Sequence, residues 1–182
     1  MARLSAAPLV ALAVAALIAA CGSPAKPSGA PNAPASSPHA AAGQATGVPA
    51  QLQFSAKTLT GQSFSGESLA GKPAVLWFWA PWCPTCQQEA PVLAKVAAAN
   101  PRVTFVGVAA RDQVSSMQSF VDKYHLGGLT QLADTDGTVW AKFGITRQPA
   151  WAFVSADGSV DVVKGRLTES QLTERIGGLV NR

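Results

Sequence analysis

The chain has 182 residues, a length that accommodates one ordinary domain with an appendage but not two domains. Only 13% of the residues are charged, the formal net charge is +4, and no three basic residues are consecutive, so the basic patch typical of nucleic-acid-binding proteins is absent. Three cysteines are too few for a disulfide-dense small protein, and the lack of a glycine period, long heptads or repeated hydrophobic spans excludes collagen, coiled-coil and multi-pass membrane proteins.

Residues 1–20 have the pattern of a signal peptide. Arg3 supplies a positive charge, and the apolar run Leu9–Ala20 is too short to span the ~30 Å of membrane hydrocarbon. The run ends in Ile18-Ala19-Ala20-Cys21, which resembles the bacterial lipobox, whose cysteine receives diacylglycerol before cleavage. We therefore predict a lipoprotein signal peptide, lipidation of Cys21 and anchoring at the outer face of the cell membrane. An ordinary secretory signal, or an uncleaved hydrophobic helix, with an incidental Cys21 is the alternative.

Residues 21–50 consist mainly of Ala, Pro, Ser and Gly. Val48 is the only branched apolar residue of this stretch and Lys26 its only charge, so it buries too little surface to offset the entropy of ordering the backbone. We predict a flexible, lipid-anchored linker in which His39 is a solvated side chain rather than a metal ligand. Residues 51–182 then form a single domain.

The first elements of this domain are extended. Polar residues alternate with Leu52, Phe54 and Ala56, and Ser63–Ser65 follows a turn at Thr60-Gly61, which predicts a β-hairpin. The continuous apolar run Ala74–Trp79 predicts a central strand that is buried on both faces.

A helix, a strand and a second helix come next. We predict a helix over Pro84–Ala99, in which Pro91 removes one hydrogen bond, and a buried strand over Val103–Val108. Asp112 is expected to cap the following helix. That helix places four residues on its inner face: Val114, Met117, Val121 and Tyr124.

The last part of the chain predicts a hairpin and a helix. Asp157-Gly158 separates the strands Ala150–Ser155 and Val160–Val163, and Thr168 with Gln171 forms a capping box. The final helix turns three residues inward: Leu172, Ile176 and Leu179. The order of elements predicts an α/β fold in which a right-handed βαβ unit and an antiparallel hairpin share one mixed central sheet flanked by helices.

The residues with the clearest chemistry are Cys83-Pro84-Thr85-Cys86, at the point where the central strand turns into a helix. Zinc needs four ligands, and the third cysteine is Cys21 while His125 lies far along the chain. A purely structural disulfide does not explain why the pair begins a helix, where a thiolate is best stabilised. We therefore predict redox chemistry, with Cys83 as the first helical residue and the nucleophile, and with Cys86 facing inward as the resolving cysteine.

The segment from Trp82 to Pro91 resembles the W-C-x-x-C-x-x-E-x-P signature of exported thioredoxin-fold proteins, the TlpA, ResA and DsbE groups. The flanking strands and Gln148-Pro149 extend the likeness over nearly all of residues 51–182. The sequence is most similar to the actinobacterial DsbE/DsbF group of secreted or lipid-anchored disulfide oxidoreductases, and the lipobox favours the DsbF type. The resemblance implies a thioredoxin-like fold, here with an N-terminal β-hairpin extension.

The resemblance also implies roles for further residues. Pro149 matches the cis-proline that faces the disulfide, and the backbone at Gln148 pairs with the substrate; a trans proline at the start of a strand is the alternative. Glu89 matches a glutamate that exchanges a proton with the inner sulfur of Cys86, unless it is an ordinary exposed glutamate. Trp82 is expected at the rim of the site, where it offers apolar surface to unfolded substrates.

Two further features bear on function. Asp134-Thr135-Asp136-Gly137 lacks the later glutamate of a calcium loop and indicates a turn before a short helix over Thr138–Phe143. The Pro84-Thr85 dipeptide differs from the Gly-Pro of reducing thioredoxins.

The resulting functional prediction is disulfide formation in exported proteins, with the Cys83–Cys86 pair as the only redox group and neither a metal nor another cofactor. The expected partners are reduced exported proteins, a membrane thiol-redox protein that recycles the pair, and the membrane itself through the lipid, but not nucleic acid. A ResA-like reductase acting in cytochrome c maturation and a non-catalytic peptide-binding envelope lipoprotein are the alternatives.

Overall fold

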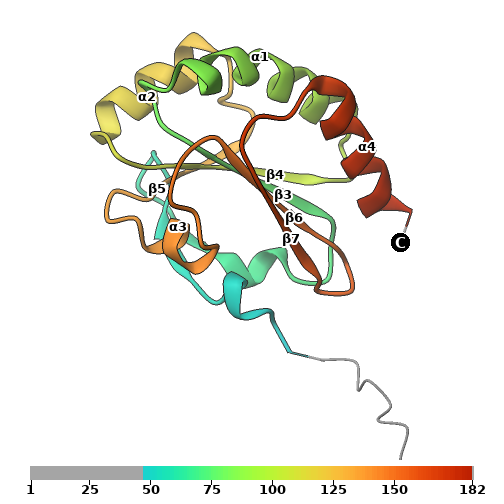
Figure 1. Cartoon of the computed structure of the whole chain (residues 1–182). Coiled ribbons are helices and arrows are strands. Elements are labelled where there is room, and N and C mark those ends of the chain that lie inside the picture. Colours follow the sequence, from blue (N-terminus) through green and yellow to red (C-terminus); the bar gives the residue numbers. More distant parts are fainter. Residues whose placement is uncertain (1–46, 182) are drawn as a thin grey trace, which may run out of the picture. The chain divides into compact units, whose positions relative to one another are not determined.

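A five-stranded mixed sheet forms the centre of the computed structural model, which describes residues 47–181 (Figure 1). The strand order is β5–β4–β3–β6–β7; β3 pairs in parallel with β4 and antiparallel with β6. The bounds are β3 (Ala74–Trp79), β4 (Thr104–Ala109), β5 (Thr130–Ala133), β6 (Ala150–Val154) and β7 (Val160–Lys164). All six residues of β3 are buried, which confirms the predicted central strand.

Helices cover the two faces of the sheet unequally (Figure 1). The helical face carries α1 (Pro84–Ala99), α2 (Val114–Lys123) and α4 (Glu169–Val180). The hairpin face carries α3 (Thr138–Lys142), the N-terminal hairpin of β1 (Ser55–Lys57) and β2 (Ser63–Ser65), and the 3₁₀ turns η1 (Ala50–Leu52) and η2 (Gly66–Leu69). Because side chains alternate along a strand, β3 supplies Val75, Trp77 and Trp79 to the first core and Ala74, Leu76 and Phe78 to the second. The predicted thioredoxin-like arrangement is confirmed.

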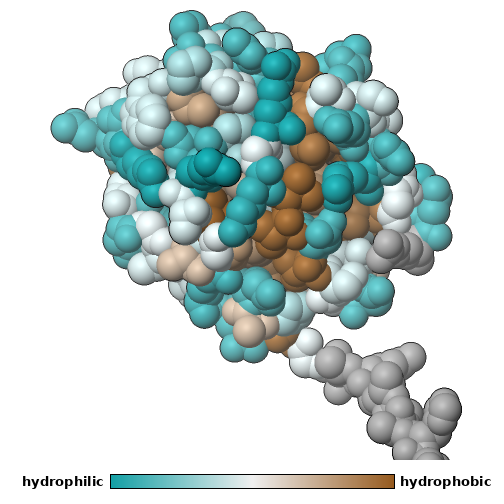
Figure 2. All heavy atoms as spheres, in the orientation of Figure 1, coloured by the Kyte–Doolittle hydropathy of each residue, from teal (hydrophilic) through white to brown (hydrophobic). Residues whose placement is uncertain are grey.

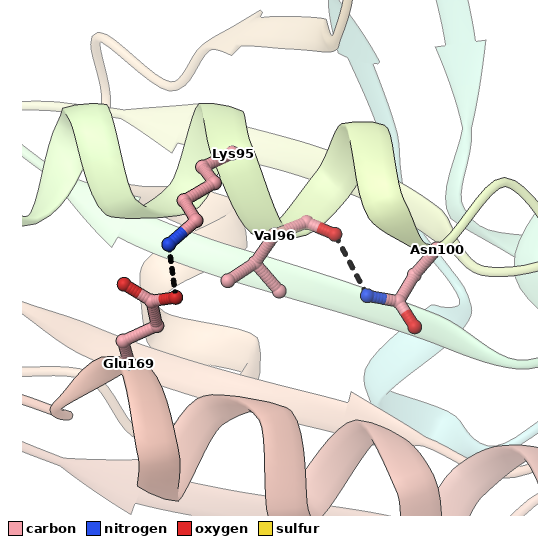
Figure 3. Close-up of polar contacts among 4 residues, drawn as sticks. All are labelled: Lys95, Val96, Asn100 and Glu169. Atoms are coloured by element: carbon pink, nitrogen blue, oxygen red, sulfur yellow. Dashed lines mark hydrogen bonds and ion pairs between the residues drawn. The ribbon is translucent and has the colours of Figure 1, made fainter.

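Helix α1 has the predicted bounds and continues through Pro91. At its C-terminal end the side-chain amide of Asn100 donates to the carbonyl of Val96 at 2.8 Å, and Lys95 forms an ion pair with Glu169 of α4 at 2.6 Å (Figure 3). The side chains of that pair are 70% and 47% exposed, so it contributes less than about 1 kcal/mol. The two helices are held mainly by the apolar side chains that they share in one core.

Strand β5 was not predicted from the sequence. It is four residues long, and the polar Gln131 interrupts its apolar pattern. Gln131 is nevertheless buried, and its backbone carbonyl accepts a hydrogen bond from the amide of Leu59 at 2.9 Å. The N-terminal hairpin therefore covers the β5 edge of the sheet, where Thr58 also forms a bridge with Leu132.

The beginning of α2 also differs from the prediction. Its N-cap is Gln113, and the carboxylate of Asp112 accepts a hydrogen bond from the Gln113 amide instead of capping the helix, so the predicted cap is wrong. Met117 and Val121 face the core as expected. Val114, the first helical residue, is 40% exposed, so its predicted position on the inner face is wrong.

Smaller shifts occur elsewhere. The predicted strand over Val103–Val108 lies one residue later, and Leu52 belongs to a 3₁₀ turn rather than to a strand. The β6–β7 hairpin, α3 and the α4 capping box agree with the predictions within one residue. Strand β7 forms the other edge of the sheet and has half-buried valines; Figure 2 shows an apolar band on this side of the molecule.

The signal peptide over residues 1–20, Cys21 and most of the linker over residues 21–50 lie outside the described residues. The described part begins at Gly47, and Val48 already packs against the core of the hairpin face. None of the helices within residues 47–181 has the length and apolar character needed to cross a membrane.

Candidate active site

The two cysteines lie at the start of α1, immediately after the turn that follows β3. Pro84 is the first helical residue, as the predicted bounds require, and Cys83 is the N-cap residue rather than the first residue of the helix. The Cys83 sulfur accepts a hydrogen bond from the amide of Cys86 at 3.1 Å, and the two residues form a disulfide with Cα atoms 5.2 Å apart. The sulfur of Cys83 thus has the position of a capping acceptor, where unpaired amides and the helix dipole favour negative charge.

The two sulfur-bearing residues differ little in burial. Cys86 is fully buried and Cys83 is 4% exposed, so the difference has the predicted direction but is smaller than expected. Trp82, immediately before them, is 52% exposed and lies at the rim as predicted. Of the two cysteines only Cys83 therefore reaches the surface, next to the exposed Trp82.

Gln148-Pro149 forms the opposite wall. The peptide bond between them is cis, as the resemblance implies. Because Ala150 pairs with Phe78 in the antiparallel register of β6 and β3, Pro149 lies at the same edge of the sheet as the turn that leads to Cys83. Pro149 is buried and Gln148 half-buried. The structure therefore brings all of the predicted site residues of the domain to one region, except Glu89, which lies deeper.

Glu89 is buried, with 2% of its surface exposed, so the alternative of an ordinary surface glutamate is wrong. Its carboxylate accepts hydrogen bonds from the Trp77 indole at 3.1 Å and from the Leu167 amide at 2.8 Å. Burial raises its pKa above the ordinary value of 4.5, while these bonds and the positive charge of Arg166 act in the opposite direction. Glu89 follows Cys86 by three residues on the buried face of α1, one helical turn away. A carboxyl group with a raised pKa is thus available on the inner side of the pair.

A layer of aromatic rings lies under the site. Trp77 packs against Trp79 and Trp151, with ring centroids 5.6 and 5.9 Å apart, and Trp79 stacks on Phe120 at 4.3 Å. The Trp79 indole donates to Gln131 at 3.2 Å. These large side chains exclude water from the inner side of the disulfide and explain the desolvation of Glu89.

The sequence did not identify two residues near the site. The Trp151 indole N–H faces the Glu89 carboxylate and lowers its pKa, although it has no full hydrogen bond. Arg111 follows β4 and contacts the segments on both sides of the disulfide. The sequence could have pointed to Arg111 through its position shortly after a predicted strand. The carboxyl ends of the parallel strands β3 and β4 meet at one edge of the sheet, where α/β folds bind their ligands.

No group of three or more His, Cys, Asp or Glu side chains within residues 47–181 is placed to hold a metal ion. The buried Asp134 accepts hydrogen bonds from the amides of Val139 and Trp140, so its turn precedes α3 as predicted. Burial raises the pKa of Asp134, although these bonds act in the opposite direction. Cys21 lies outside the described residues.

Comparison with known proteins covers the whole region of the site. The sequence model of the AhpC/TSA family matches residues 47–163. The soluble secreted antigen MPT53 of Mycobacterium tuberculosis is 50% identical over 141 residues, which cover 76% of this chain and 81% of that protein.

Two solved structures are similar as well. DsbF of MTB (M. tuberculosis), in mixed oxidized and reduced forms, is 68% identical with a TM-score of 0.72 over 73% of this chain and 99% of that one. A secreted M. tuberculosis disulfide oxidoreductase homologous to E. coli DsbE is 52% identical with a TM-score of 0.68 over 71% of this chain and 98% of that one. The residues matched by the family model span the positions of the cysteine pair and of the cis-proline.

Proposed function

Because this chain belongs to the AhpC/TSA family and is a thiol:disulfide oxidoreductase of the DsbE, DsbF and ResA type, we propose that it forms disulfide bonds in exported proteins. The observation that carries the proposal is the position of Cys83, whose sulfur caps α1 and accepts a hydrogen bond from the Cys86 amide. A stable Cys83 thiolate is a good leaving group, and stabilising the reduced form makes the disulfide a better oxidant.

The reaction proceeds in two exchanges. A substrate thiolate attacks the sulfur of Cys83, the bond between Cys83 and Cys86 breaks, and Cys86 leaves as a thiolate. A second thiolate of the substrate then attacks the substrate sulfur of this mixed disulfide and releases Cys83 as a thiolate. The substrate loses two electrons and two thiol protons, and the cysteine pair takes up the two electrons. A membrane thiol-redox protein accepts these electrons in turn and restores the disulfide.

Glu89 supports the first exchange. Cys86 becomes charged in a fully buried position, which is costly in an apolar environment. Glu89, one helical turn away, exchanges a proton with this thiolate, and burial raises the pKa of its carboxyl group above the ordinary value, closer to that of a thiol. In our proposal it is therefore the proton carrier of the inner cysteine.

In this proposal the substrate binds to the two walls of the site, which are Trp82 and Gln148-Pro149. Trp82 offers an exposed aromatic surface beside Cys83, which suits apolar segments of unfolded polypeptides. The backbone at Gln148, before Pro149, pairs with the substrate chain as a short strand.

The reduction potential of the Cys83–Cys86 pair tests the direction of electron flow. Equilibration with glutathione or dithiothreitol buffers, read by alkylation, is expected to give a value near the ~−180 mV of protein disulfide isomerase rather than the ~−270 mV of thioredoxin. A value as low as that of thioredoxin, together with a reduced pair in cells, favours the ResA-like reductase. A Cys83→Ala protein that keeps every activity favours a peptide-binding role without catalysis.

We further propose that the chain acts outside the cytoplasm, with residues 1–20 as a signal peptide, residues 21–50 as a linker anchored by lipid on Cys21, and residues 51–182 as the catalytic domain. The signal and lipobox patterns support the anchor, whereas the name of the MPT53 relative describes a soluble secreted protein. Metabolic labelling with a radioactive fatty acid distinguishes the two. We expect label on the wild-type protein and none on Cys21→Ala; an unlabelled wild-type protein in the medium contradicts the anchor.

A further inference from the structure

Arg111 occupies the loop between β4 and α2 in an unusual backbone conformation. Its φ angle is 63°, in the left-handed region that residues with a Cβ atom rarely adopt. Within residues 47–181 only His125, just after the end of α2, shares this property among the non-glycine residues. A conformation of this kind persists only where surrounding contacts hold it, which directs attention to what Arg111 contacts.

Those contacts join the two walls of the site. The backbone carbonyl of Arg111 accepts a hydrogen bond from the Trp82 indole at 3.1 Å. Its guanidinium donates to the carbonyl of Thr146 at 2.6 Å, three residues before Pro149. The guanidinium carbon also lies 5.2 Å from the centre of the Trp140 ring of α3, which fixes the direction of the side chain. A single residue therefore connects the loop before Cys83, the loop before Pro149 and α3.

We propose that Arg111 is a positioning residue for polypeptide substrates, which keeps the Trp82 wall and the wall over residues 146–149 at a fixed spacing across the disulfide. The inference rests on the proposed function, because it concerns how the same site holds its substrate. A polypeptide that presents a thiol to Cys83 contacts both walls, and walls that are already ordered lose less conformational entropy when it binds. A small dithiol reaches the sulfur without using either wall.

The position of the guanidinium separates this role from a direct effect on the sulfur. The guanidinium contacts the Thr146 carbonyl and the Trp140 ring, and neither contact involves a cysteine. Loss of the side chain should therefore weaken binding of polypeptides, which raises KM. It should leave the intrinsic exchange rate and the reduction potential of the pair unchanged.

Three variants separate the parts of Arg111, and a fourth variant is the control. Arg111→Gly keeps a residue suited to the left-handed backbone, and with it the carbonyl for Trp82, but removes the guanidinium. Arg111→Ala removes the guanidinium and also disfavours the backbone conformation. Arg111→Lys keeps a donor and the charge. Arg102→Ala is the matched control, because it removes one positive charge from an exposed side chain that lies just before β4, outside both walls of the site.

The test compares two substrates for each purified variant: reduced, unfolded ribonuclease A and dithiothreitol. With ribonuclease we expect kcat/KM to fall about tenfold for Arg111→Ala and about fivefold for Arg111→Gly, in both cases through KM. We expect a partial recovery in Arg111→Lys and less than about twofold change in Arg102→Ala. With dithiothreitol, and in the reduction potential, all four variants should match the wild-type protein.

Three results overturn the inference: equal losses with both substrates, a shifted potential in Arg111→Gly, or wild-type kinetics in Arg111→Gly. The first two place Arg111 in the sulfur chemistry, and the third leaves no role for its side chain. If the wild-type protein oxidises no ribonuclease, the proposed direction of electron flow fails. In that case the kcat/KM of each variant relative to the wild type is measured for the reduction of insulin and for the reduction of a small disulfide. A loss confined to insulin supports the role of Arg111 independently of the direction of electron flow.

Discussion

Each face of the sheet buries one carboxylate, and the two differ in what holds them. Asp134 on the hairpin face accepts hydrogen bonds from the amides of Val139 and Trp140, five and six residues later in the chain. Glu89 on the helical face accepts them from Trp77 and Leu167, which belong to distant segments. Both are 2% exposed, and burial raises the pKa of both. Burial and a raised pKa therefore do not distinguish a local structural carboxylate from a chemical one.

Their surroundings do distinguish them. Asp134 satisfies the amides at the start of α3 and lies on the side of the sheet opposite the core that contains the cysteines. Glu89 lies one helical turn from Cys86, beneath a layer of aromatic rings. The comparison predicts that loss of the Asp134 charge affects mainly stability, whereas loss of the Glu89 charge affects mainly the exchange reaction.

The largest effect is expected from the sulfur that caps α1. Cys83→Ser removes the sulfur through which the substrate is exchanged, and we expect the rate of disulfide exchange to fall by at least about 10³-fold. Insulin reduction and ribonuclease oxidation both measure it. Cys86→Ser is the matched control, because it should accumulate mixed disulfides with substrates through Cys83. If only Cys83→Ser accumulates them, the roles of the two cysteines are reversed.

The next effect separates the two carboxylates. Glu89→Gln removes the titrating group, and we expect exchange to slow by about 10²-fold near neutral pH, with loss of the bend that Glu89 gives to the pH–rate profile. Asp134→Asn should stay within about twofold of the wild-type rate while it loses about 1–2 kcal/mol of stability, because the amide group cannot accept both backbone bonds. An unchanged pH profile in Glu89→Gln would show that both carboxylates are structural.

Much of this site follows from the sequence, because its parts are local. Cys83, Cys86 and Trp82 are adjacent, and their position between a strand and a helix is determined by the apolar run before them and by Pro84 after them. The burial of Glu89 is less local. It depends on Leu167, which comes close only when the chain between β7 and α4 passes over α1.

The missed features share a dependence on tertiary contacts. Strand β5 is short and contains Gln131, whose buried side chain is paired by the Trp79 indole and the Leu126 carbonyl. The role of Arg111 depends on two loops that are separate in sequence. Asp112 is of a residue type that favours the N-cap position, but α2 begins one residue too late for Asp112 to cap it.

Stability should depend on pH through the two buried carboxylates. Their pKa values are raised in the folded protein above the ordinary 4.5 of Glu89 and 3.8 of Asp134. The folded state therefore binds these protons more tightly, and the resulting stability is fully present below those ordinary values and is lost as pH rises through the folded ones. Chemical denaturation at a series of pH values measures this effect. As pH rises, the free energy of unfolding should fall less in Glu89→Gln and in Asp134→Asn than in the wild-type protein. A difference between wild type and variant that is constant with pH contradicts the direction of the shifts.

Packing on the helical face gives a further test. A Cβ atom at Gly107 would overlap the side chain of Gln131 and approach the Trp79 indole. Gly107→Ala should therefore cost about 1–3 kcal/mol in the free energy of unfolding. Gly177→Ala is the control, because nothing lies within 4 Å of its added Cβ. Equal stability of the two variants would mean that the Trp79–Gln131 contact is not tightly packed.

The smallest effect is expected at an exposed carboxylate of the helical face. Glu169→Gln removes the ion pair with Lys95, and because both side chains are exposed we expect a loss of less than about 1 kcal/mol, reduced further by salt. Thermal unfolding at low and high ionic strength measures it. A loss of stability as large as that of Asp134→Asn would mean that exposed and buried carboxylates of this protein contribute equally to its stability.

The most direct test is the pKa of Cys83, measured by the ultraviolet absorbance of its thiolate. The measurement uses the Cys86→Ser variant, in which the absorbance change is not mixed with that of Cys86. The position of the sulfur at the start of α1 predicts a pKa clearly below the ~8.5 of a free cysteine. A Cys83 that titrates at that free value would contradict the central claim that the helix N-terminus activates it.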